Sequence, residues 1–338
     1  MPTTPIFGKK NVLVTGGAGF IGSHLCERLL KEAKVICLDN FVNSNVRNIE
    51  HLLQLPDFEF IRADINQPID LDSFKELEKF KVKFQGVQEI YHLACPTSIK
   101  NFEEFKIETL QASSVGMCNV LELAVKHKAK LLFTSSSVVY GGRRANDKYF
   151  REEDIGLVDQ LSPRACYDEG KRFGETMVET YRQTHGLDAK IARVFRTYGP
   201  RQRLFDGEMV PDFITNAIDG KDLVIYGDEN FRTSLVYVSD LVDGLIKLMK
   251  AQRNIGPVNL GADSDVKIME VAEMIVKLLG SKSKIVFEPS LLFLTELGVP
   301  DIRKAKEFLG WLPLVRLQDG LKKGIDYAQA QKTLVGIG

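Results

Sequence analysis

Short apolar runs alternate with longer amphipathic patterns through the first 200 residues, and this alternation constrains the fold more than any other feature. Two neighbouring parallel strands need a crossover between them, and a helix is the usual crossover. The alternation therefore predicts an α/β fold, a doubly wound parallel sheet with helices on both faces. The runs predicted as strands are 11–15, 34–38, 58–62, 89–93, 130–135 and 190–195.

The alternation weakens after Pro200, which predicts a second and smaller domain. We place the larger domain at residues 1–200 and the smaller C-terminal domain at 201–330. A helical pattern at 236–250 and a strand pattern at 257–260 suggest that the chain returns to the larger domain over 234–262. The smaller domain is then discontinuous.

The charge balance gives the chain no general attraction to polyanions. Among 338 residues, 45 Lys and Arg face 45 Asp and Glu, so neither nucleic acid nor an anionic membrane is an expected partner. No segment approaches the ~18 consecutive apolar residues of a membrane span, and the start lacks a signal-peptide pattern. The five cysteines are scattered and form no Cys-x-x-Cys pair, which predicts free thiols, a cytoplasmic location and no metal site.

A glycine-rich loop follows the first predicted strand. The strand 11–15 runs into Gly16-Gly17-Ala18-Gly19-Phe20-Ile21-Gly22, and a helical pattern begins at once. This context favours binding of a dinucleotide pyrophosphate at the N-terminus of the helix, although a purely structural turn is the alternative. Asp39 ends the second strand, where a carboxylate can bind both ribose hydroxyls and repel a 2′-phosphate. The pattern predicts NAD rather than NADP, with a solvated strand-end Asp39 as the alternative.

Tyr167 and Lys171 are four residues apart at the start of a predicted helix, so both side chains project from one face. Lys171 and an oxidised nicotinamide are both cationic, and together they would favour the ionised phenol of Tyr167 as a base for an alcohol proton. Ser136 at the end of the fifth predicted strand can hold the same substrate oxygen. A chance surface pair and strand-end capping by the serines are the structural alternatives.

Several further stretches match a family pattern: Tyr91–Pro96, Cys166–Arg172, Thr197–Arg201, Asp206–Gly207, Tyr226–Asp228, Tyr237–Gly244, Pro300–Ile302 and Lys304–Lys306. Over nearly its whole length the chain resembles the extended short-chain dehydrogenase/reductases of the NAD-dependent epimerase/dehydratase family. Within that family it is most similar to the UDP-glucuronate decarboxylases, also called UDP-xylose synthases. The string Cys166-Tyr-Asp-Glu-Gly-Lys-Arg172 is the most specific of these stretches.

The resemblance implies a Rossmann-type larger domain that binds NAD and a smaller domain that binds a nucleotide sugar, with UDP expected. It implies that Tyr167, Lys171 and Ser136 are catalytic and that the first two also contact NAD. The other residues implied for the NAD site are Gly16, Gly19, Phe20, Ile21, Gly22, Asp39, Asn40, Asp64, Ile65, Leu93 and Ala94. The residues implied for the substrate are Ser136, Arg196, Arg201, Val224, Tyr226 and Arg232.

Five positions depart from the decarboxylase pattern. Val138 stands where the decarboxylases have a glutamate, and it can neither move a proton nor orient a carboxylate. Arg196 and Ser114 each replace an asparagine, and Val299 replaces a basic residue that helps bind the diphosphate. Arg232 is one place out of register with the arginine of the family. These changes leave the chemistry after the first oxidation open.

Three functions follow from the resemblance and its departures. The leading prediction is decarboxylation of UDP-glucuronate to UDP-xylose through a 4-keto sugar. A UDP-sugar 4-epimerase is the runner-up, because inversion at C4 needs no additional acid at Ser137 or Val138, whereas a 4,6-dehydratase would need an acid and a base there. A non-catalytic NAD-binding scaffold is the third, and the retention of Ser136, Tyr167 and Lys171 argues against it.

Two long amphipathic patterns, at 103–128 and 163–184, also predict how the chain associates. Each has enough apolar residues to pack on the sheet and on a second copy of the chain. Together with the family's habit, they predict a homodimer in which these helices form a four-helix bundle.

Overall fold

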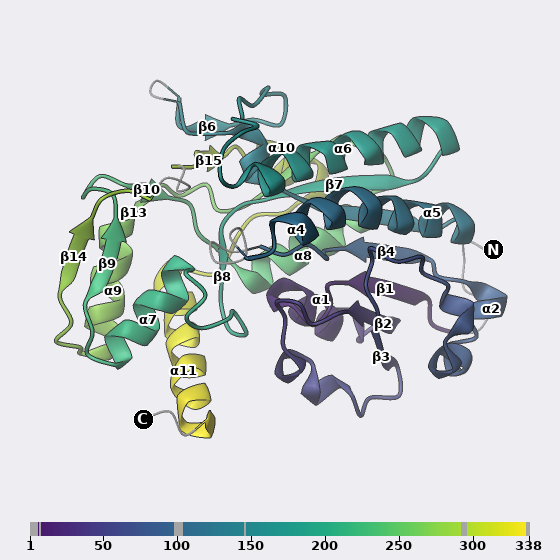
Figure 1. Cartoon of the computed structure of the whole chain (residues 1–338), viewed down its shortest axis with the longest axis horizontal. Coiled ribbons are helices and arrows are strands. Elements are labelled where there is room, and N and C mark those ends of the chain that lie inside the picture. Colours follow the sequence, from purple (N-terminus) through teal and green to yellow (C-terminus); the bar gives the residue numbers. More distant parts are fainter. Residues whose placement is uncertain (1–5, 7, 98–103, 145–146, 292–295, 336–338) are drawn as a thin grey trace.

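The computed structural model describes residues 6, 8–97, 104–144, 147–291 and 296–335 and contains a seven-stranded, entirely parallel sheet (Figure 1). The strand order is β12-β7-β5-β4-β1-β2-β3. The strands are β1 (Asn11–Thr15), β2 (Lys34–Asp39), β3 (Phe58–Arg62), β4 (Glu89–His92), β5 (Lys130–Ser136), β7 (Ala189–Val194) and β12 (Val258–Leu260). This sheet confirms the predicted α/β class.

The side chains of the central strands alternate between two hydrophobic cores, as the period of a strand requires. Val12 and Val14 of β1 belong to the core that also holds Leu25 of α1 (Phe20–Leu29) and Leu241 of α8 (Val238–Lys250). Leu13 belongs to the opposite core, with side chains from α5 (Met117–His127) and α6 (Ala165–His185). Helices therefore cover both faces, which makes the sheet doubly wound.

The predicted helix 103–128 is divided in the structure, and residue 103 lies outside the described residues. Its described part consists of α4 (Lys106–Gln111), a π-helical turn at Ala112–Gly116 and α5. The π-turn brings Gly116 so close to the turn after β3 that an added Cβ would lie 2.7 Å from Cδ1 of Ile65. An insertion of this kind is common beside functional sites.

A second group of elements lies at one end of the sheet (Figure 1, left). It contains α7 (Met209–Ile218), α9 (Ile268–Leu279), α11 (Leu317–Val335) and the paired strands β9 (Leu223–Tyr226) and β14 (Ile285–Glu288). Later in the chain, α8 packs against α1 and β7, and β12 pairs with β7 in the larger sheet. The remaining elements are α2 (Val82–Gln85), β6 (Tyr149–Phe150), β8 (Thr197–Tyr198), β10 (Arg232–Thr233), β11 (Val236–Tyr237), β13 (Val266–Lys267), β15 (Val299–Pro300) and α10 (Arg303–Leu309).

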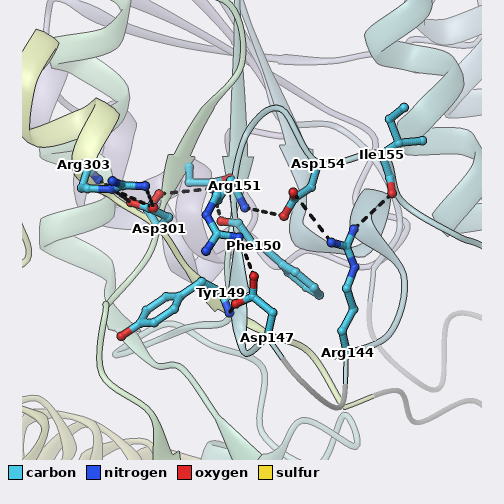
Figure 2. A network of polar contacts seen from close by, with 10 residues as sticks. Arg144, Asp147, Tyr149, Phe150, Arg151, Asp154, Ile155, Asp301 and Arg303 are labelled. Carbon is cyan, nitrogen blue, oxygen red and sulfur yellow. Dashed lines mark hydrogen bonds and ion pairs between the residues drawn. The ribbon is translucent and has the colours of Figure 1, made fainter.

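Ion pairs stabilise the long connection that leads from β5 to α6 (Figure 2). Arg151 donates from its side chain to Asp147 at 2.6 Å and from its backbone N–H to Asp154 at 2.9 Å. Arg144 lies 3.8 Å from Asp154 and also donates to the carbonyl oxygen of Ile155. The connection is thus held by its own charges before it enters α6.

Candidate active site

The strand order reverses at β1, which lies between β2 and β4, and a ligand crevice is expected beyond the carboxyl ends of the strands at such a point. A cavity of about 950 Å³ lies there. Residues of β2 and β5 and of the segments that follow β1 and β4 line one part of it, and residues of α7 and β9 in the smaller group line the other. The cavity is therefore shared by the two parts of the molecule, and its size suits a dinucleotide with a second ligand.

The glycine loop forms the floor of this cavity where α1 begins. Gly16 has φ of +72° and donates its N–H to the carbonyl oxygen of Leu38 at 2.8 Å. An added Cβ at Gly22 would lie 2.1 Å from the carbonyl oxygen of Gly16, so no larger residue fits. Gly19 is the N-cap, and the unpaired N–H groups of the first turn of α1 are available to an anion. This cradle fits the pyrophosphate of NAD.

Asp39 is buried at the end of β2 and faces the same cavity. Its carboxylate accepts hydrogen bonds from the N–H groups of Ala18 and Phe41, at 3.0 and 2.9 Å, and from the hydroxyl of Ser44 at 2.7 Å. Two carboxylate oxygens have about four acceptor positions, so one remains for a ribose hydroxyl. The other residues expected around NAD also line the cavity: Phe20, Ile21, Asn40, Asp64, Ile65, Leu93 and Ala94.

Tyr167, Lys171 and Ser136 line the cavity together. Lys171 is buried, and its ammonium donates to the carbonyl oxygen of Thr134 at 2.9 Å. The same ammonium lies 5.5 Å from the centre of the Tyr167 ring. Ser136 accepts from the N–H of Val138 at 3.4 Å, so its hydroxyl hydrogen remains available for a substrate oxygen.

A buried polar network lies behind these three residues. Glu175 of α6 accepts from the hydroxyl of Ser135 at 2.5 Å and from two nitrogens of Arg193 at 2.9 and 2.7 Å. Arg193 also donates to Tyr140, whose hydroxyl donates to Asn259 of β12. The network joins α6 to β5, β7 and β12, so it holds the helix that carries Tyr167 at a set distance from Ser136.

Most of the residues expected to bind the sugar nucleotide line the cavity, but their side chains have different partners. Arg196, Val224 and Tyr226 line the cavity. Arg201 also lines it, but its guanidinium donates to Glu27 at 2.5 Å and lies 3.2 Å from Nε2 of His51.

Arg232 differs from the expectation, because it is not among the described residues that line the cavity. It lies in β10, its Nη2 donates to the carbonyl oxygen of Asp265 at 2.7 Å, and its Nε lies 3.1 Å from the carboxylate of Asp265. The one-residue shift noted in the sequence places this side chain on Asp265 rather than toward a ligand.

The sequence profile described as the NAD dependent epimerase/dehydratase family matches residues 12–261. The chain belongs to this family. The match spans both the glycine loop and the Tyr167–Lys171 pair, so the family resemblance is confirmed by residues that meet in one cavity.

Curated relatives in the epimerase/dehydratase family include UDP-glucuronic acid decarboxylase 1 of Danio rerio, which is 40% identical over 320 residues, or 94% of this chain and 72% of the relative. UDP-glucuronic acid decarboxylase 4 of Arabidopsis thaliana is 39% identical over 92% of this chain and 66% of the relative. Among solved structures, UDP-glucuronic acid 4-epimerase from Bacillus cereus, in complex with UDP-glucuronic acid and NAD, has a TM-score of 0.82 and 29% identity over 95% of this chain and 99% of its own. UDP-glucose 4-epimerase from Thermotoga maritima, with UDP-glucose, has a TM-score of 0.83 and 26% identity over 96% of this chain and 99% of its own.

The departures from the decarboxylase pattern have different structural consequences in this family member. Val138 is buried, lines the cavity and leaves an apolar wall beside Ser136. Ser114 donates to the carbonyl oxygen of Leu110 at 2.8 Å and does not line the cavity. Val299 is buried in β15 opposite Tyr149 and is also not a lining residue. Among the replacements, Val138 and Arg196 are the two that change the cavity surface.

Sequence reasoning missed Glu208 and Arg164, which both line the cavity near Arg196. Glu208 immediately follows the Asp206–Gly207 stretch that carried the family resemblance, and Arg164 lies one helical turn before Tyr167. Their nearness in sequence to Asp206–Gly207 and to Tyr167 was the available signal. Only the folded chain brings the two residues together in the cavity.

Proposed function

We propose that the protein is an NAD-dependent UDP-glucuronate decarboxylase that forms UDP-xylose through a 4-keto sugar. The observation that carries this proposal is the joint placement of the glycine loop, Asp39 and the Tyr167–Lys171–Ser136 group in one cavity of a chain 40% identical to a UDP-glucuronic acid decarboxylase over 94% of its length. The presence of all three reactive side chains favours an enzyme over a non-catalytic scaffold.

The glycine loop and Asp39 would hold NAD, which would supply an acceptor and donor of the hydride at C4 of the sugar. Tyr167 takes the proton of the C4 hydroxyl, while the positive charge of Lys171 favours the phenolate and Ser136 holds the same oxygen. Oxidation at C4 places a ketone β to the C6 carboxylate. The C5–C6 bond then breaks, its electron pair passes toward the ketone, and carbon dioxide leaves. C5 then takes a proton from water, the hydride returns to C4, and Tyr167 returns its proton to the C4 oxygen.

Mass spectrometry of the products from a panel of UDP-sugars tests the function directly. We expect UDP-glucuronate to lose carbon dioxide and yield a UDP-pentose. Conversion of UDP-glucuronate only to an isomer of unchanged mass would contradict the decarboxylase and support the 4-epimerase.

The 4-epimerase is the second candidate because Val138 offers no proton-transfer group beside Ser136. A wall of this kind leaves room for a 4-keto sugar to turn and accept hydride on its other face. The likeness of this chain to the solved UDP-glucuronic acid 4-epimerase from Bacillus cereus, with 29% identity and a TM-score of 0.82, also supports this candidate.

The cofactor is recycled in this scheme, because the hydride removed from C4 returns to the sugar in each cycle. We expect purified protein to retain NAD and to show transient NADH absorbance after addition of UDP-glucuronate. If the protein retained NAD but showed no such absorbance with several UDP-sugars, the scaffold function would replace the enzymatic one.

A homodimer is the further expectation for this enzyme, and the exposed apolar side chains of α4, the π-turn and α6 support it. Ile107, Leu110 and Val115 are 69%, 52% and 50% exposed, and Phe173 of α6 is 50% exposed. Because α4 packs beside α6, these four residues form one apolar surface, here called the α4–α6 surface. A second copy of the chain would cover it by packing its own α4–α6 surface against it.

Location in the cytoplasm stays a prediction. It is supported by the five cysteines, all of which are described and free. Within the described residues, no helix is long and apolar enough to cross a membrane.

A further inference from the structure

Two side chains of opposite charge, Arg196 and Glu208, line the same cavity. Arg196 follows β7 by two residues, and the strand register pairs Val194 of β7 with Ser136 of β5. Arg196 and Val138, each two residues beyond this pair, therefore lie at the same edge of the sheet. Glu208 precedes α7 as its N-cap and lines the same part of the cavity.

Neither charged group has a side-chain hydrogen bond or an ion pair among the described residues. Among the described residues, no side chain forms a hydrogen bond with the guanidinium of Arg196 or the carboxylate of Glu208, and their charged atoms are more than 4 Å apart. By contrast, neighbouring Arg164 donates to Asp168 through two nitrogens, at 3.0 and 2.9 Å. Arg196 and Glu208 thus retain hydrogen-bonding capacity that can be offered to a ligand.

The surroundings make these charges energetically important. Burial lowers the pKa of Arg196, which Glu208 opposes, and burial raises the pKa of Glu208, which Arg196 opposes. Each group therefore interacts with the other across the cavity. An arginine that is partly buried in a cavity binds an anion more strongly than a fully exposed arginine does.

We propose that Arg196 binds the C6 carboxylate of the nucleotide sugar and that Glu208 is the counter-ion of Arg196 when no sugar is bound. The inference rests on the proposed UDP-glucuronate substrate and names the residue that recognises its acid group. The position fits, because C6 is two carbons from C4, and Arg196 lies at the same sheet edge as Ser136 and lines the same cavity.

Glu208 has a second consequence for the chemistry. A carboxylate loses its charge as carbon dioxide leaves, so an arginine bound to it stabilises the ground state more than the transition state. Because Glu208 shares the charge of Arg196, it weakens that ground-state stabilisation. The pair thereby holds the acid sugar without preventing the loss of its carboxylate.

Equilibrium binding of UDP-glucuronate and UDP-glucose tests the recognition, since the two ligands differ only at C6. The measurements use NAD-loaded protein in a Tyr167→Phe background, which stops turnover. We expect Arg196→Gln to weaken the binding of UDP-glucuronate at least tenfold and to change the binding of UDP-glucose by no more than about twofold. Arg203→Gln is the matched control, because Arg203 lines the same cavity but its side chain is 61% exposed. The proposal would be overturned if Arg196→Gln kept the ratio of the affinities for UDP-glucuronate and UDP-glucose. It would also be overturned if Arg203→Gln lost as much affinity for UDP-glucuronate as Arg196→Gln.

The double variant Arg196→Gln/Glu208→Gln guards against a folding defect, because it leaves no unpaired charge in the cavity. It should show the same loss of preference for UDP-glucuronate. Glu208→Gln alone should bind UDP-glucuronate severalfold more tightly and release carbon dioxide more slowly, and weaker binding would contradict the role of Glu208.

Failure of this inference is distinguishable from failure of the proposed function. If unmutated protein releases carbon dioxide but Arg196→Gln keeps the ligand preference, only the inference fails. If Arg196→Gln loses the preference while unmutated protein releases no carbon dioxide, the decarboxylase proposal fails and the recognition of the carboxylate stands.

Discussion

Val138 shows how one side chain can decide which reaction a shared site performs. It is buried beside Ser136, at the wall of the cavity where the decarboxylase pattern has a glutamate. A β-keto acid loses carbon dioxide without a dedicated acid, so the replacement is compatible with a slow decarboxylase. It is equally compatible with a sugar that turns over within an apolar wall.

Val138→Glu separates these two outcomes. In a decarboxylase, the new carboxyl group should speed carbon dioxide release from UDP-glucuronate, with an upper bound near the ~10²–10⁴-fold that a positioned acid or base supplies. In a 4-epimerase it should slow the isomerisation or leave it unchanged. Quenched-flow product analysis measures both, and Val138→Gln is the control of equal size that lacks a titratable group. An equal acceleration by the Gln variant would remove the proton-transfer explanation.

Asp39 carries the prediction of cofactor choice. Because its carboxylate repels a 2′-phosphate and accepts a ribose hydroxyl, Asp39→Ala should weaken NAD about 10–100-fold and reduce the discrimination against NADP. Asp39→Asn tests the charge separately, since an amide oxygen can still accept the bond from Ala18. Fluorescence titration with NAD and with NADP gives the ratio of the two dissociation constants. Equal affinity of the unmutated protein for NAD and NADP would contradict the role of Asp39.

At the scale of elements, α6 links catalysis to the surface of the molecule. The face of this helix that carries Tyr167 and Lys171 into the cavity also carries Glu175, which binds Arg193, and the opposite face exposes Phe173. The α4–α6 surface therefore includes part of the helix that carries Tyr167, the proposed proton acceptor. Association at this surface would hold α6 from outside as the Glu175 network holds it from inside.

The double variant Leu110→Glu/Phe173→Glu tests the dimer. Two charges on each α4–α6 surface would meet like charges of the second copy in an apolar interface, so we expect a monomer. Light scattering at micromolar concentration measures the mass. Phe308→Glu is the control, because Phe308 is 56% exposed on α10, outside this surface, and the variant should remain a dimer. If the unmutated protein were a monomer at that concentration, the predicted dimer would be wrong.

At the scale of the whole molecule, one carboxylate ties the smaller group of elements to the larger sheet. Asp265 precedes β13 and accepts from two nitrogens of Arg143, at 3.0 and 2.9 Å, while Arg143 follows β5 and the turn after it. Arg232 of β10 and Lys148 lie near the same carboxylate. The hydrogen bond from Arg143 is the main reason that the pKa of Asp265 is below its usual range.

This pair predicts a pH-dependent contribution to stability. A lowered pKa in the folded state means that the stabilisation is fully present above the unfolded pKa of ~3.9 and is lost as the pH falls through the lower folded pKa. Asp265→Asn should therefore reduce the free energy of unfolding by ~2 kcal/mol at pH 7, with a smaller difference below pH ~4.

Urea unfolding at several pH values measures this difference. Asp263→Asn is the control, because Asp263 is half exposed in its pair with Lys306 and should change stability by less than ~0.5 kcal/mol. A pH-independent difference for Asp265→Asn would show that the charge of Asp265 is not responsible.

The local features of this protein were determined by its sequence. Each of the first six sheet strands was predicted to within one residue at both ends, because buried parallel strands require short apolar runs. The glycine loop and the Tyr167–Lys171 pair depend only on neighbouring residues and the geometry of one helix, and both were predicted in place. The NAD cofactor followed from the same local pattern.

Contacts between distant segments were decided only by the tertiary structure. Arg232 was expected at the cavity and instead bonds to Asp265, because β10 pairs with β13 and places its side chain there. Glu208 and Arg196 are 12 positions apart in sequence, and no local periodicity relates a residue after a strand to the N-cap of the next helix. Which charges meet in the cavity depends on how the two parts of the chain fold around it, and that arrangement is a property of the whole molecule.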